Sequence, residues 1–199
     1  MGGQSAEQPT SDASQDALES NIDLELPGLA GESQSAVLRE HLFPLFYSSS
    51  TSFRVAALIA YSHHIRTNRQ QMEPTLALRL HGIAIASINS ALDHPDSCRR
   101  DDTLVAVALM AKYEALFGNK SHCSTHLFGL AHLLRSRGKA AQPNCFGVLE
   151  KYLFFIDSNV AHIVGCRRYL DPFEFMPTRS YIGHPDPDVK QFTAGGLAG

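Results

Sequence analysis

Apolar side chains recur at intervals of three and four residues along most of this chain, from about residue 35 onward. This spacing places them on one side of an α-helix, so it predicts helices rather than strands. The two-residue alternation typical of a half-buried strand, bounded by turn residues, is essentially missing. The pattern predicts six helices, over residues 36–47, 53–66, 73–92, 103–117, 121–137 and 145–169.

Three of these segments indicate how the helices pack. Segment 103–117 is apolar almost all round, so we expect it to be the central, buried helix. Segments 73–92 and 121–137 each have one apolar face, which we expect to point inward. The inward face is predicted to comprise Leu76, Leu80, Ile83, Ala84, Ile88 and Ala91 in the first, and Leu127, Leu130, Ala131 and Leu134 in the second.

Polar residues at the segment borders predict where two helices begin. Asp101 or Asp102 is expected to cap the helix over 103–117, because a side-chain oxygen there accepts a hydrogen bond from a free backbone N–H. Ser121 is expected to cap the next helix, which ends at Arg137.

These elements predict an all-α fold, either an antiparallel helical bundle or a helix-pair stack of about six helices. Composition predicts three parts: a disordered acidic segment over 1–33, a helical domain over 34–170, and an irregular tail over 171–199. The first part is rich in Ser, Gln, Gly and Asp and has no aromatic residue, which is typical of disorder.

Charge is unevenly distributed along the chain. The 199 residues include 17 Lys and Arg and 20 Asp and Glu, a net charge of −3, which argues against nucleic-acid binding by bulk electrostatics. Residues 1–33 hold seven of the acidic residues and no Lys or Arg, so the rest of the chain carries +4. Within them, 17–29 (ALESNIDLELPGL) interleaves acidic and aliphatic side chains, as amphipathic activation segments do. An ordinary solubilising tail is the alternative interpretation.

The four cysteines (Cys98, Cys123, Cys145 and Cys166) are too far apart for a C-x-x-C motif and follow no signal peptide. Free thiols in a reducing compartment are therefore expected. No apolar run approaches the roughly 18 residues needed to cross a bilayer, and the longest lies near 104–111. These features predict a soluble intracellular protein without membrane contact.

Ten histidines raise the question of a metal or catalytic site. His122 and His126 are spaced four residues apart, but the glutamate of an H-E-x-x-H motif is missing and Cys123 points away from their face. The adjacent pair His63 and His64 diverges on a helix. No G-x-S-x-G, G-x-G-x-x-G or P-loop motif is present. The sequence therefore predicts no catalytic residue, no metal ligand and no cofactor, and the chain is not expected to be an enzyme.

Residues 73–138 carry a recognisable pattern. An alanine-rich helix, LALRLHGIAIASINSAL, precedes DDTL and VAVALMAKYEALF, and the run HLFGLAHLL with Arg137-Gly138 follows. With these motifs, the chain resembles the fungal-specific regulatory region of Zn(II)2Cys6 transcription factors, the all-helical domain that follows their zinc cluster. The resemblance covers about residues 50–199. Gly129 within the run is expected to let a neighbouring helix approach closely.

The resemblance implies a transcription regulator that acts in the nucleus on a fungal gene set, including secondary-metabolite genes. The six clustered cysteines of the zinc-binding element are missing from this sequence, and relatives usually continue further at the C-terminus, so we expect a regulatory region truncated at both ends. Its implied partners are full-length transcription factors or coactivators, with homo- or heterodimers and only indirect DNA contact. Two alternatives remain open. One is a helical small-molecule-binding or enzymatic domain whose pocket is lined by His81, His126 or His132, and the other is a non-functional fragment that exposes an apolar face.

Overall fold

The computed structural model describes residue 40 and residues 43–67, 74–137, 148–171, 174 and 189–194. Within these ranges the regular structure is helical, with no strand, which confirms the all-α prediction. Five long helices and two short ones are described: α3 (Phe43–Tyr47), α4 (Ser50–Thr67), α5 (Pro74–Leu92), α6 (Asp101–Leu116), α7 (Lys120–Arg137), α8 (Val148–Val164) and α10 (Val189–Ala194).

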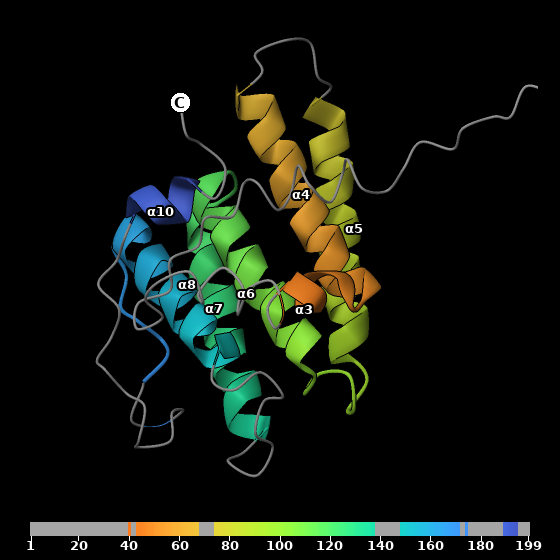
Figure 1. Ribbon diagram of the computed structural model, residues 1–199, viewed down its shortest axis with the longest axis vertical. Helices are drawn as coiled ribbons and strands as arrows, with labels where there is room; N and C mark the ends of the chain where they lie inside the picture. The colour runs from red at the N-terminus through yellow and green to blue at the C-terminus, as the bar shows by residue number, and fades with distance from the viewer. Residues whose placement is uncertain are drawn as a thin grey trace, which may run out of the picture.

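Helix α6 is the centre of the fold, as its apolar composition predicts. Every residue from Asp102 to Ala115 is buried. Helices α4, α7 and α8 all pack against it, and α4 with α5 forms an antiparallel pair on one side (Figure 1). Burial on all sides explains why the sequence of α6 has no polar face.

The predicted helix caps are wrong in detail. Helix α6 begins at Asp101, and Arg100 stands at its N-cap position without a side-chain capping bond. Asp101 and Asp102 lie in the first turn, where negative charge suits the helix dipole. For α7, Asn119 rather than Ser121 caps the helix, because the Asn119 side-chain oxygen accepts the Ser121 backbone N–H at 3.0 Å.

Helix α8 ends earlier than the sequence pattern predicts. It stops at Val164 because Gly165 adopts a positive φ of 76°, a conformation that favours glycine and terminates helices. The chain then turns back, and the buried Asp157 carboxylate accepts the backbone N–H groups of Tyr169 (3.0 and 3.1 Å) and Leu170 (3.1 Å). Burial raises the pKa of Asp157 to about 6, although these hydrogen bonds oppose the change.

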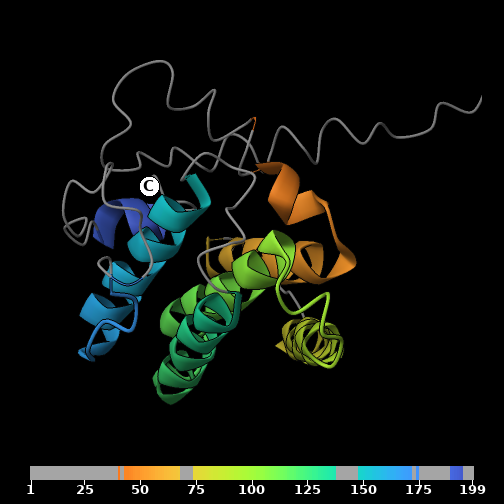
Figure 2. The same cartoon turned by 90° about the horizontal axis from the view of Figure 1, so that it is seen from below.

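Helix α5 lies at the edge of the bundle and packs mainly on α4, so much of its surface is open (Figure 2). The prediction of its inward face is correct for Ala84 and Ile88, which are buried. It is wrong for Leu76 and Ile83, whose exposed fractions are 41 % and 48 %. The inward face is therefore narrower than the apolar pattern suggests.

A short helix, α10, lies within the segment predicted to be an irregular tail. Its Phe192 side chain is fully buried and contacts the Phe155 ring of α8, with ring centroids 6.0 Å apart. The core therefore includes a residue beyond the predicted domain limit at residue 170.

The predicted inward stripe of α7 is confirmed, since Leu127, Leu130 and Ala131 are buried and Leu134 packs against the core. The role predicted for Gly129 is wrong: a Cβ atom added there would meet nothing within 4 Å. Cys98, Cys123 and Cys166 are free thiols, as expected. The acidic segment over 1–33 and Cys145 lie outside the described residues.

Candidate functional site

Two of the histidines that the sequence singles out, His81 and His122, lie beside a buried carboxylate rather than in an open pocket. Glu114 of α6 is 2 % exposed, and its Oε1 atom lies 2.8 Å from His81 Nε2 and 3.7 Å from His122 Nδ1. Its Oε2 atom accepts the Asn119 backbone N–H at 2.6 Å. Burial alone would raise the pKa of Glu114, but the bonds from His81 and Asn119 and the nearby histidine charges lower it on balance. Glu114 thus ties α5 and the α6–α7 turn to the central helix.

The remaining histidines do not converge on one cavity. His132 is exposed, and His126 is half-buried, with its pKa lowered mainly by burial. Cys123 is buried with its Sγ atom 4.0 Å from the Asn119 carbonyl oxygen, and burial raises its pKa to about 11. Within the described ranges, no group of three or more His, Cys, Asp or Glu side chains is arranged to hold a metal ion.

Two basic side chains, His63 and Lys112, are buried without an oppositely charged partner among the described residues. His63 of α4 has no hydrogen-bond partner for either ring nitrogen among the described residues, and its ring meets Phe117 edge-on at 4.7 Å. Burial, with the charges of Lys112 and Arg66, lowers the pKa of His63 to about 4. Lys112 of α6 lies over the Phe192 ring at 4.8 Å, and burial lowers its pKa to about 8. Because both side chains are buried, neither is open to a ligand.

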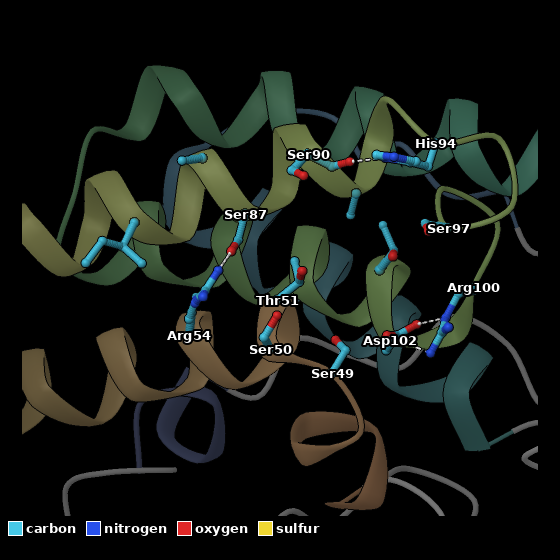
Figure 3. A pocket seen from close by; sticks show the side chains of 14 residues that line it. Ser49, Ser50, Thr51, Arg54, Ser87, Ser90, His94, Ser97, Arg100 and Asp102 are labelled. Carbon is cyan, nitrogen blue, oxygen red and sulfur yellow. Dashed lines mark hydrogen bonds and ion pairs between the residues drawn. The ribbon is translucent and has the colours of Figure 1, made fainter.

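An open groove of about 740 Å³ lies between the first half of α4 and the second half of α5 (Figure 3). The turn after α5 and the first residues of α6 close one end. Its floor is apolar where Ile83, Ala86 and Ala91 contribute. Hydroxyl groups surround this floor, supplied by Ser49, Ser50, Thr51, Ser87, Ser90, Ser97 and Thr103.

Positive charge dominates the walls of the groove. Arg54 projects from α4 and donates a hydrogen bond to the Ser87 hydroxyl of α5 (Figure 3). It makes no ion pair with any carboxylate of the described residues. Arg100 pairs with Asp102 at 3.0 Å, and His94 donates its Nδ1 proton to the Ser90 carbonyl at 2.8 Å. Among the described residues of the lining, Asp102 is the one carboxylate against two guanidinium groups, and because it pairs with Arg100, none of these residues compensates the charge of Arg54.

The two helices that form the groove share an unusual composition. Helices α4 and α5 contain Arg54, Arg66 and Arg79 but no Asp or Glu. They also carry five of the six large apolar side chains that are exposed among the described residues: Phe53, Leu76, Leu78, Ile83 and Leu92. By length and composition, α5 is apolar enough to cross a membrane, with a mean hydropathy of 1.2 over Thr75–Leu92. That observation is weak evidence for a membrane span, whereas a basic and apolar surface suits a binding partner.

Sequence reasoning missed this groove. The apolar pattern places Ile83 on the inward face of its helix, whereas the structure exposes this side chain at the groove. The available signal was the lack of any acidic residue over 50–67 and 74–92, next to an acidic segment at 1–33.

The conspicuous sequence motifs serve packing. Asp101 at the start of α6 forms an ion pair with Arg137 at the end of α7, so the DDTL motif and the end of the HLFGLAHLL run meet. Leu127 and Leu130 of that run are buried, whereas Phe128 is 59 % exposed. The motifs therefore define how α6 and α7 pair.

Comparison with known proteins identifies the family of the chain. No curated protein and no solved structure matches the chain significantly. Residues 29–163, about two thirds of the chain, match the fungal specific transcription factor domain, which spans the helices from α3 to α8. The chain belongs to the family of fungal-specific transcription factor domains.

Proposed function

We propose that this protein regulates transcription in the nucleus through contacts with other proteins, with residues 1–33 as its activating surface. Its family is a regulatory, non-enzymatic one, which gives the chain a transcription-regulator-like role. The observation that supports action through protein contacts is the basic and apolar surface of α4 and α5. Its partners in this proposal are full-length transcription factors or coactivators, in homo- or heterodimers, and it reaches DNA only through them.

The acidic-aliphatic segment 17–29 is the part of the chain best suited to recruit a coactivator. Acidic residues keep Leu18, Ile22 and Leu26 solvated until a partner groove accepts them. In this proposal residues 1–33 act as a unit distinct from the helical domain over 34–170.

The regulated genes in this proposal are a fungal set that includes secondary-metabolite genes. Transcript profiling after deletion of the gene would identify them.

A one-hybrid assay tests the activating surface. The full chain is fused to a heterologous DNA-binding domain, and reporter output is compared with that of the variant Glu19→Gln, Asp23→Asn, Glu25→Gln. We expect the wild-type fusion to activate the reporter. The triple variant should reduce reporter output at least five-fold. A matched control, Glu7→Gln, Asp12→Asn, Asp16→Asn, changes the net charge equally outside the segment and is expected to keep the signal.

Two outcomes would contradict the proposal. A full-chain fusion that gives no reporter signal, either as wild type or with Arg54→Gln in the groove between α4 and α5, would exclude an activating surface if protein levels are normal. Equal losses in the triple variant and its control would identify residues 1–33 as a solubilising tail.

A further inference from the structure

We propose that the groove between α4 and α5 is a docking site for the acidic-aliphatic segment 17–29 of the same chain. The groove offers the Arg54 cation, which pairs with no carboxylate of the described residues, beside an apolar floor. The segment offers carboxylates beside aliphatic side chains. The two surfaces are complementary in charge and in apolar character, and they belong to one molecule.

The groove selects for an occupant that is both anionic and apolar. Arg54 is held by the Ser87 hydroxyl, so its guanidinium keeps free N–H donors for a carboxylate. Ile83 is 48 % exposed at the floor, and Ala86 and Ala91 lie along the same side of α5. A purely polar anion would leave this apolar surface in water, and a purely apolar occupant would desolvate Arg54 without compensation.

The segment presents both kinds of side chain at a regular spacing. Leu18, Ile22 and Leu26 recur every four residues, and Glu19 and Asp23 directly follow the first two. When the segment docks as a helix, this spacing places the aliphatic side chains along one side and the two acids on a neighbouring side. The aliphatic side would meet the floor and the acids would meet Arg54.

The connection between segment and groove is long enough. Residues 30–42 join the segment to α3, and thirteen extended residues span up to about 45 Å. Helix α5 has 19 residues and is about 28 Å long. Helix α3 directly precedes the first turn of α4, which lines the groove. Residues 30–42, the tether, therefore end next to the proposed docking site. Such a tether gives an effective concentration in the millimolar range, which favours the segment over a free competitor.

Docking would control the availability of the segment. While it occupies the groove, it is not free to bind a coactivator. This consequence rests on the proposed function, whereas the docking itself does not.

The test measures binding of a fluorescent peptide of residues 17–29 to full-length protein by anisotropy. The first protein is wild type, and the second is the full chain with Glu19→Gln, Asp23→Asn and Glu25→Gln, whose own segment has lost its acids. We expect the peptide to bind the second protein at least ten-fold more tightly, because the wild-type groove is already occupied. Adding Arg54→Gln to the second protein should weaken peptide binding at least ten-fold. Adding Lys120→Gln, which removes an exposed cation from α7 outside the groove, should not.

A charge exchange guards against a folding defect in the Arg54 variants. Arg54→Glu in the neutralised chain should reject the wild-type peptide but bind a peptide with Glu19→Lys and Asp23→Lys. Failure of the exchanged pair to bind, with an unchanged circular dichroism spectrum, would overturn the role of Arg54.

Three further results would overturn the proposal. Equal peptide affinity for wild type and the neutralised chain would show that the segment does not occupy the groove. Inorganic phosphate that displaces the peptide at micromolar concentration would assign the groove to a small anion. A wild-type dimer in sedimentation that Arg54→Gln dissociates would assign it to a second copy. Because this test reads binding alone, its failure is distinguishable from a failure of the one-hybrid assay.

Discussion

Replacing Lys112 with methionine should stabilise this protein at neutral pH. Lys112 belongs to the central helix α6 and is only 6 % exposed. Its ammonium group lies 4.8 Å from the centre of the Phe192 ring, a cation–π contact that stabilises the charge. Methionine keeps the length and the unbranched shape of the side chain while removing the charge.

The expected gain follows from the cost of keeping the ammonium charged in the core. Burial lowers the pKa of Lys112 from 10.5 to about 8. At about 1.4 kcal/mol per pKa unit, this corresponds to roughly 3 kcal/mol of destabilisation while the group is charged. The cation–π contact with Phe192 favours the charged form and offsets about 1–2 kcal/mol of that cost, and it reduces the pH-linked change in stability by the same amount. Lys112→Met should therefore gain about 1–2 kcal/mol in the free energy of unfolding, which raises Tm by roughly 3–6 °C.

The pH dependence gives the prediction a second, independent readout. Between pH 8 and pH 10.5 the unfolded chain keeps the Lys112 proton that the folded chain has lost, so the stability of the wild type rises with pH. The advantage of Lys112→Met should thus be largest below pH 8 and shrink toward zero near pH 10.5. Urea denaturation at pH 7 and pH 10 measures both values. The exposed Lys120→Met should change stability by less than about 0.5 kcal/mol and serves as the control.

Two results would refute this reasoning. A loss of more than about 1 kcal/mol in Lys112→Met at pH 7 would mean that the buried ammonium makes a net favourable contribution. A gain that is equal at both pH values would mean that the charge is not its source.

Three further predictions concern the contacts that join the helices. Glu114→Gln should destabilise the fold by about 1–3 kcal/mol, because it removes the carboxylate that binds the α6–α7 turn and His81. Urea denaturation measures this loss, and an unchanged midpoint would contradict the prediction. His63→Phe should lose less stability than the wild type between pH 6.5 and pH 4, because the folded wild type resists protonation of this buried ring over that window. The free energy of unfolding, measured for both proteins across this pH range, checks the prediction. Equal slopes would mean that the ring is already charged in the folded chain. Gly165→Ala should cost about 1 kcal/mol at the positive φ that ends α8, and a neutral result in thermal unfolding would argue against that conformation.

Composition alone was enough to predict the centre of the fold, but not its edge. Helix α6 is apolar on every side, so no choice of face was needed to place it in the core. Helix α5 also has apolar residues on several sides, and one strip of it packs while the rest meets water. That strip includes the buried Ser87, whose hydroxyl accepts a hydrogen bond from Arg54, a residue 33 positions earlier that no local pattern points to.

The groove was not predictable from the sequence because it is assembled from parts that are distant along the chain. Ser50 and Arg54 come from one helix, Ile83 from the next, and Arg100 from the turn before a third. Each looks ordinary in its own segment. The ion pair between Asp101 and Arg137 is a similar case, since the sequence shows two separate motifs and the fold brings them together.

The position of Phe192 has a consequence for the order of events during synthesis. Lys112 is made early, whereas the Phe192 ring that lies over its ammonium group is translated only after α4 to α8. A nascent chain therefore lacks this cation–π contact while α4 to α8 are being made. The contact is added only when α10 emerges and packs on α8, so the end of the chain contributes to stabilising a charge in its middle.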